Sequence, residues 1–316
     1  MKTLKKIIPI LIIALLLFQS CKDDDTDVVI IPETNTIVDI AVASDNLTSL
    51  VAALQKANLV TTLAGDGPFT VLAPTNDAFA AFLTSNGFSS LDDVPVDILT
   101  NILLNHVVSG SIASTDLSTG YANTLATSSA SGTGMSLYID ISNGVRFNGV
   151  SSVSAADILA VNGVIHKVDA VIGLPNIVTF ATADPNFSTL VSALTRSDLT
   201  TDFVGVLSTD SATAPAPFTV FAPTNEAFSA LPAIPEEEPL TQILLYHVVA
   251  GNIASANLTN PGNTTAMTLQ GEDITVTMPE ATITDASGNT DIGIIAVDVQ
   301  ALNGVIHVIN KVMLPL

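Results

Sequence analysis

Histidine is the residue type in this sequence best suited to chemistry, and its spacing repeats. His106 and His166 stand 60 positions apart, and so do His247 and His307. Because imidazole titrates near neutral pH and binds metal ions, a pair of histidines could form a metal site or an acid–base pair. The repeated spacing therefore raises the hypothesis of two equivalent sites, one in each half of the chain.

The residues around the histidines favour a structural role instead. The four apolar runs that contain them are LLNHVV, GVIHKV, LLYHVV and GVIHVI. A buried imidazole must find hydrogen-bond partners, and one that does so can connect a helix to a sheet. Two histidines are few for a metal site, and no nearby cysteine or HExxH motif completes one. We therefore expect four buried structural histidines and no metal site.

A hydrolase is the alternative interpretation of the same residues. Asp157 precedes His166 by nine positions, and Asp298 precedes His307 by the same nine, so a carboxylate could accompany an imidazole in each half. The sequence has no GxSxG elbow, phosphate-binding loop or dinucleotide fingerprint. We therefore expect no catalytic residues, no enzymatic activity and no cofactor.

Three polar segments carry weaker signals. The acidic run Glu236–Glu238 lies in PEEEP, which we expect to be a solvated loop. Asp285 and Asp291 in DASGNTD resemble a loose calcium loop, although a hairpin turn is the favoured interpretation. Ser211 lies in an Asp-Ser-Ala triplet that resembles a bacterial O-glycosylation motif, which makes it a candidate for that modification.

An eleven-residue phrase occurs twice in the chain. FTVLAPTNDAF begins at Phe69, and FTVFAPTNEAF begins at Phe218. The proline of the phrase ends a β run, and Thr75 and Thr224 follow it at a position where a side chain can cap a helix. We interpret the phrase as a strand-to-helix corner.

The repetition extends along the whole chain. IVDIAVASDNLTSLVAAL from Ile37 aligns with IVTFATADPNFSTLVSAL from Ile177, and VNGVIHKV aligns with LNGVIHVI. Two long copies of this kind indicate tandem globular domains rather than a solenoid. We expect domain 1 at residues 35–174 and domain 2 at residues 175–316.

Each copy has helical periodicity first and alternating strands later. Around the phrase, apolar residues recur at helical spacing, and residues 98–108 are expected to continue as a helix. Asn143–Gly144 and residues 287–289 are turn signals between alternating strands. Helices followed by strands predict an α+β fold for each domain.

These motifs resemble the fasciclin (FAS1) domain family. The repeated phrase is similar to the family's first signature box, NHVV and YHVV to its tyrosine-histidine motif, and NGVIHKVDAVI and NGVIHVINKVML to its second box. Tyr246 matches the tyrosine of the motif, whereas Asn105 replaces it in the first copy. The resemblance implies that each domain is a two-sheet β-wedge flanked by short helices.

The resemblance also implies a secreted or surface protein that mediates adhesion, with no shared catalytic activity. In the family, peptides near the first box and the tyrosine-histidine motif are linked to receptor binding. That link makes Asn76, Asp77, Asn225 and Glu226 candidate partner-binding residues. A buried anchor cannot also contact a partner, so exposure separates the two roles.

The N-terminus resembles a bacterial lipoprotein signal. A basic head precedes the apolar run Ile7–Phe18, which as a helix would span about 18 Å, short of the roughly 30 Å hydrocarbon core. Cys21, the single cysteine, directly follows the small residue Ser20 and is the expected lipid attachment site. We expect a signal peptide at residues 1–20 and an acidic flexible tether at 21–34. The mature protein is then expected to be an outer-membrane lipoprotein that faces the cell surface.

The composition limits the class of partner. Acidic residues outnumber basic ones by 30 to 9, which disfavours nucleic acid. We expect a membrane-anchored adhesion or ligand-binding module whose partner is an extracellular protein or glycan. The alternatives are a structural envelope protein and an accessory glycan-binding lipoprotein in polysaccharide capture. The low aromatic content, 5%, weakens the glycan alternative because sugar platforms use aromatic rings.

Overall fold

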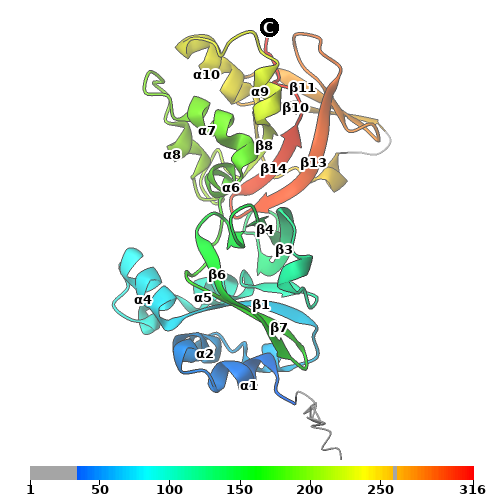
Figure 1. The fold of residues 1–316 in the computed structure, drawn as a ribbon. Coiled ribbons are helices and arrows are strands. Elements are labelled where there is room, and N and C mark those ends of the chain that lie inside the picture. Colours follow the sequence, from blue (N-terminus) through cyan, green and yellow to red (C-terminus); the bar gives the residue numbers. More distant parts are fainter. Residues whose placement is uncertain (1–33, 259–261) are drawn as a thin grey trace, which may run out of the picture. The chain divides into compact units, whose positions relative to one another are not determined.

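Two copies of one helix-and-strand unit follow each other along the chain (Figure 1). The structure is a computed structural model, and it describes residues 34–258 and 262–316. The predicted signal peptide, Cys21 and nearly all of the predicted tether lie outside the described residues. Within the described part of the chain, no helix has both the length and the apolar character that a membrane crossing requires.

Domain 1 contains the elements from α1 to β7. Its helices are α1 (Ile37–Val42), α2 (Thr48–Lys56), α3 (Val60–Ala64), α4 (Asn76–Ser85) and α5 (Val96–Leu104), with 3₁₀ turns η1 (Asp45–Leu47), η2 (Leu91–Asp93) and η3 (Ser114–Asp116). Its strands are β1 (Phe69–Pro74), β2 (Val107–Ser109), β3 (Gly120–Thr127), β4 (Gly134–Asp140), β5 (Arg146–Phe147), β6 (Ser151–Ala160) and β7 (Gly163–Val168).

Domain 2 contains the elements from α6 to β14. Its helices are α6 (Ile177–Ala183), α7 (Ser188–Leu194), α8 (Phe203–Leu207), α9 (Asn225–Ser229) and α10 (Glu237–Tyr246), with 3₁₀ turns η4 (Pro185–Phe187) and η5 (Ser255–Asn257). Its strands are β8 (Phe218–Pro223), β9 (Val248–Ala250), β10 (Gly262–Met267), β11 (Asp273–Met278), β12 (Thr282–Thr284), β13 (Ile292–Ala301) and β14 (Gly304–Ile309).

A parallel strand pair lies at the centre of each domain. The strand of the repeated phrase pairs with the strand of the second histidine motif, so that β1 lies beside β7 and β8 beside β14 (Figure 1). Leu72 faces His166 in register, and Phe221 faces His307. In domain 1 the seven strands close into a barrel, whereas in domain 2 they run in the order β10-β11-β12-β13-β14-β8-β9. The expectation of two tandem α+β domains is confirmed.

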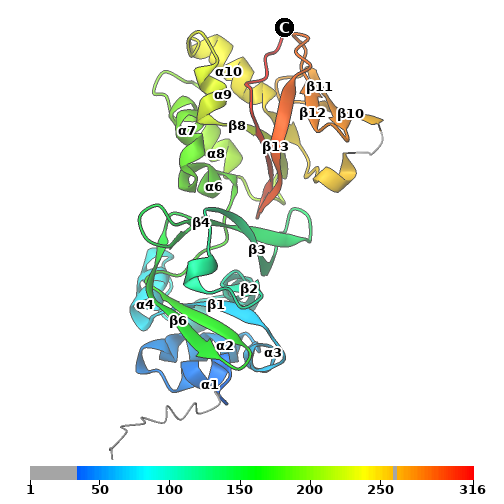
Figure 2. The ribbon, with the colours of Figure 1, turned by 45° about the vertical axis from the view of Figure 1, so that its right-hand side comes forward.

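The helices cover one side of the central strand pair and bury their apolar faces there. Figure 2 shows α1, α2 and α3 gathered beside β1. On α2, Leu50 and Leu54 are buried at helical spacing against the inward side of β1. Burying each such leucine contributes about 1.5–3 kcal/mol. The corresponding core of domain 2 carries more aromatic side chains, including Phe187 and Phe203.

Two local predictions were wrong. The helix expected over residues 98–108 ends at Leu104, because Val107 and Val108 pair with β1 and the β-branched residues extend the sheet instead. The acidic run in PEEEP does not form a loop throughout, since α10 begins at Glu237. Its carboxylates occupy the first turn, where negative charge is favoured by the helix dipole.

Candidate functional site

The repeated phrase forms a strand-to-helix corner in both domains. The Thr75 hydroxyl accepts a hydrogen bond from Ala78 N at 3.3 Å, and the Thr224 hydroxyl accepts one from Ala227 N at 3.2 Å. Each threonine therefore occupies the N-cap position of the helix that follows, α4 or α9.

The two asparagines of the phrase are engaged inside their own domains. Asn76 Oδ1 accepts from Ser49 N at 2.9 Å, and its Nδ2 donates to Asp45 O at 3.0 Å. Asn225 makes the same pair of contacts in domain 2, from Thr189 N at 2.8 Å and to Pro185 O at 2.9 Å. Both amides thus join the corner to the start of α2 or α7, and these bonds occupy the groups that a partner would need.

The acidic residues of the phrase point to solvent. Asp77 and Glu226 are exposed in the first turns of α4 and α9. Of the four candidate partner-binding residues, these two keep their charged groups available for a contact outside the domain.

Glu226 borders a cleft that both domains line. The cleft encloses about 500 Å³, and its wall includes Tyr121 and Tyr138 from domain 1 and Asp184 from domain 2. Two of the three tyrosines in the chain therefore meet at one surface depression. Asp77, the counterpart of Glu226, does not line this cleft, so the two copies of the phrase differ in their surroundings.

Asp184 links the domains at the base of the cleft. Tyr121 Oη donates to its Oδ2 at 3.0 Å, and Asn186 N donates to its Oδ1 at 3.0 Å. The ring of Tyr121 lies 5.0 Å from that of Tyr138 and 5.6 Å edge-on from that of Phe180. Burial, together with the Asp184 charge, raises the pKa of both tyrosines, so their hydroxyls stay protonated and remain donors.

A second set of contacts joins the domains at the tip of the β13–β14 hairpin. Gln300 of domain 2 makes two of them. Its backbone N donates to Ser136 Oγ of domain 1 at 2.9 Å, and its Nε2 donates to Ser128 Oγ of domain 1 at 3.1 Å. Ser128 Oγ also donates to Ala301 O at 2.6 Å. Gln300 and Ser128 are both buried, so these bonds are shielded from water.

The sequence alone did not point to Asp184, Gln300 or Ser128 as residues that join the domains. The available signal was a difference between the repeats rather than a likeness. Asp184 aligns with Ser44, and Gln300 aligns with Leu159. A charge or an amide that one copy has and the other lacks marks a contact that only one domain makes.

The first histidine of each domain connects a helix end to the segment after the last strand. His106 Nδ1 donates to Ile102 O at 2.8 Å, and its Nε2 accepts from Ile172 N at 2.9 Å. His247 repeats the arrangement with Ile243 O at 2.7 Å and Met313 N at 3.0 Å. Burial lowers the pKa of both histidines to about 4, so both rings are neutral at neutral pH.

The second histidine of each domain connects the central strand to a loop. His166 Nε2 donates to Ile112 O at 2.9 Å, and its Nδ1 accepts from Asp157 N at 3.2 Å. His307 bonds in the same way to Ile253 O, at 2.8 Å, and to Asp298 N. All four imidazoles are buried with both ring nitrogens engaged by backbone groups, which leaves none of them a nitrogen for a metal ion or for proton transfer.

The two aspartates of the hydrolase alternative hold loops. The Asp157 carboxylate accepts from the backbone N of Ser114 at 2.7 Å, and the Asp298 carboxylate accepts from the backbone N of Ser255 at 2.7 Å. The serine hydroxyls donate to the same carboxylates. Because the imidazole nitrogens face backbone groups, the arrangement contains no activated nucleophile. No cluster of three or more metal-ligating side chains occurs within residues 34–258 and 262–316.

The comparison with known families agrees with this geometry. The fasciclin domain family matches residues 45–175 and again residues 185–315. The chain belongs to the fasciclin domain family. Family membership supports a non-catalytic adhesion or binding module.

Relatives of this fasciclin-domain protein occur in bacteria and animals. Protein sll1483 of Synechocystis sp. is 40% identical over 137 residues, which cover 43% of this chain and 72% of that protein. Transforming growth factor-beta-induced protein ig-h3 of Sus scrofa is 28% identical over 305 residues, which cover 92% of this chain and 39% of that protein. This chain therefore spans well under half the length of ig-h3.

The FAS1 domain pair from the insect cell adhesion molecule fasciclin I aligns with a TM-score of 0.46 and 20% sequence identity. The alignment covers 83% of this chain and 92% of that chain.

The tyrosine-histidine motif of the fasciclin domains differs between the two copies. Tyr246 Oη donates to Asp273 O at 2.9 Å and accepts from Ala286 N at 2.7 Å, while burial raises the pKa of Tyr246 to about 12. Asn105 replaces it in domain 1, where Nδ2 donates to Gly173 O at 3.0 Å. Asn105 thus holds the segment at the end of domain 1, whereas Tyr246 holds the start of β11 and the turn between β12 and β13.

The candidate glycosylation residue and the two aspartates of DASGNTD lie at different places in this fasciclin-domain protein. Ser211 is half-buried, and its hydroxyl lies 2.7 Å from that of Ser129 in domain 1. Asp285 is buried and accepts bonds from Asn289 and Leu314, whereas exposed Asp291 pairs with Lys311. The two aspartates of DASGNTD therefore serve different contacts, and Asp285 organises the turn that joins β12 to β13.

Proposed function

We propose that the protein is a lipid-anchored surface module that binds an extracellular protein without catalysis. The observation that carries the proposal is the cleft at Glu226, which both fasciclin domains line and which holds the exposed carboxylate of the repeated phrase. Family membership and the engagement of all four histidines by backbone groups support binding rather than chemistry.

The partner that fits this cleft presents basic side chains. The chain has a formal charge of −21, and Glu226 is exposed at the rim of the cleft. Opposite charge steers association and fixes orientation. A protein partner is favoured over a glycan because Tyr138 is only 2% exposed and the Tyr121 hydroxyl is engaged by Asp184, so neither forms an open stacking platform.

A capture experiment tests the binding proposal. The soluble chain beginning at Lys22 is immobilised and offered extracellular matrix proteins and a glycan array. We expect a basic protein to be retained, and retention to fall for Glu226→Ala but not for Asp77→Ala, the matched exposed acid outside the cleft. Retention of glycans alone supports the polysaccharide alternative, and equal loss in both variants contradicts a role for the cleft.

The lipid anchor is tested separately. Cells expressing the full chain or Cys21→Ser are grown with a labelled fatty acid. We expect label on the unaltered chain only, with surface protease cleaving it in intact cells. A chain that is labelled but protected from the protease would instead face the periplasm, as a structural envelope protein could.

A further inference from the structure

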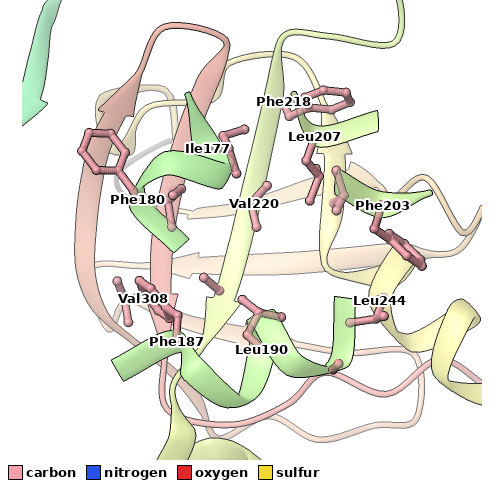
Figure 3. Packing of buried hydrophobic residues seen from close by; sticks show 14 of the residues in the cluster. Ile177, Phe180, Phe187, Leu190, Phe203, Leu207, Phe218, Val220, Leu244 and Val308 are labelled. Carbon is pink, nitrogen blue, oxygen red and sulfur yellow. The ribbon is translucent and has the colours of Figure 1, made fainter. Parts of the chain in front are cut away.

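An apolar cavity lies inside domain 2, and Phe187 separates it from the cleft because this side chain lines both. It encloses about 190 Å³ between the helices α6, α7 and α8 and the strands β8 and β14. Figure 3 shows Ile177, Leu207 and Val220, from three different elements, converging on this part of the core. Leu190 and Ile306 complete its inner wall.

The same place in domain 1 is almost filled. There the equivalent residues Ile37, Leu50, Leu63, Val71 and Ile165 enclose only about 10 Å³. Both domains use one framework and similar aliphatic side chains, so the fold itself does not require a cavity here. The two domains differ in how these helices are connected.

The link before the third helix is the connection that differs. In domain 1, residues 57–59 join α2 to α3, and Leu59 N donates to Leu54 O at 2.9 Å, which holds the two helices together. In domain 2, residues 195–202 join α7 to α8, so the link is longer. In this link Leu199 N, the counterpart of Leu59 N, donates to Arg196 O at 3.3 Å.

The mouth of the cavity is uncharged. Val204 on α8 is 38% exposed, and Thr182 and Thr195 border the opening. Both threonine hydroxyls donate to helix carbonyls, at 2.9 Å to Val178 O and at 2.8 Å to Val191 O. No charged side chain lines the cavity, so a charged ligand would lose its hydration without compensation.

We propose that domain 2 binds one small, uncharged apolar molecule in this cavity, an aromatic ring or a short alkyl chain. An apolar cavity of about 150 Å³ is large enough to hold benzene and stays free of water, which needs polar partners. A space of about 190 Å³ therefore accepts a ring with one or two added carbons. Burial of the ligand's apolar surface drives binding, and the cavity already exists without it.

Methyl NMR on the whole soluble chain tests the proposal with toluene as the probe, because domain 1 supplies an internal control. We expect saturable shifts at the methyl groups of Val191, Leu194 and Val204, and none at the equivalent Val51, Leu54 and Val60. Hexanoate, whose carboxylate is charged, should leave both sets unchanged. Equal shifts in the two domains, or none in domain 2, would overturn the proposal.

Three variants distinguish occupation of the cavity from a surface effect. Ala181→Leu fills the cavity from α6 and should weaken toluene binding at least about tenfold, since it adds three carbons to a space that holds about seven. Ala41→Leu, the matched change in domain 1, should leave binding unchanged. If Ala181→Leu does not fold, Val204→Phe closes the mouth from an exposed position and should slow or abolish binding. Unchanged binding in a folded variant would contradict the assignment.

Discussion

Tyr121 of domain 1 donates a hydrogen bond to Asp184 of domain 2 at 3.0 Å, so that a tyrosine from one repeat satisfies a carboxylate from the other. Asp184 is only 5% exposed and accepts its second bond from the backbone of Asn186. A buried carboxylate is costly unless it is hydrogen-bonded. The pair therefore couples the stability of the two domains.

Removal of the Tyr121 hydroxyl tests this coupling. Tyr121→Phe keeps the ring contacts with Tyr138 and Phe180 but leaves Asp184 with one donor fewer. We expect the free energy of unfolding to fall by about 1.5–3 kcal/mol, the range for a hydrogen bond to a charged group, as measured by urea denaturation. The double variant Tyr121→Phe, Asp184→Asn should lose less free energy of unfolding than the two single variants lose together. Strict additivity would show that the two side chains are not coupled.

The first histidine of each domain can be tested by truncation. His106→Ala leaves Ile172 N without its partner in the core, removes one of the two hydrogen bonds to Ile102 O, and adds a cavity. We expect a loss of about 3 kcal/mol or more in unfolding free energy, measured by thermal or urea denaturation. Asp77→Ala, which changes an exposed residue, should alter the unfolding free energy by no more than about 0.5 kcal/mol. A folded His106→Ala protein of unaltered stability would contradict the structural role.

The low pKa of two histidines predicts how stability depends on pH. His106 and His247 have an ordinary pKa of 6.5 when unfolded and about 4 when folded, because burial disfavours the charged ring. The unfolded chain therefore binds more protons between these values, and stability is full above pH 6.5 and falls as the pH drops toward 4. The loss amounts to about 3 kcal/mol for each histidine.

Denaturation curves between pH 7 and pH 4 measure this dependence. The chain with His106→Gln should lose less stability over the same range than the unaltered chain, even though its stability at pH 7 is lower. A pH profile that is flat between 6.5 and 4 would show that the rings are not buried and neutral.

The charge of the proposed partner predicts a dependence on salt. If Glu226 contacts basic side chains, raising the ionic strength from 0.05 M to 0.5 M should slow association of the captured partner, because salt screens charges that meet at an exposed rim. Surface plasmon resonance at several salt concentrations measures the association rate. The association rate of the Glu226→Gln variant should depend less on salt. An association rate of the unaltered chain that does not change with salt would contradict a basic partner.

Local features of the fold could be predicted from the sequence because neighbouring residues determine them. Thr75 and Thr224 cap the helices that follow them, and Asn143–Gly144 lies in the loop between β4 and β5. The helix end at Leu104 could not be located in this way, since Val107 and Val108 continue the apolar run and only their pairing with β1 separates strand from helix.

By itself, the sequence determined that two similar α+β domains follow one another, because capping, turn chemistry and apolar periodicity act over a few residues and were repeated. Only the tertiary structure decided that Asn76 and Asn225 are engaged inside their domains, that Asp184 meets Tyr121, and that the domain 2 core contains a cavity. These facts depend on how distant segments pack. A long link between two helices changes that packing while leaving the local pattern of each helix intact.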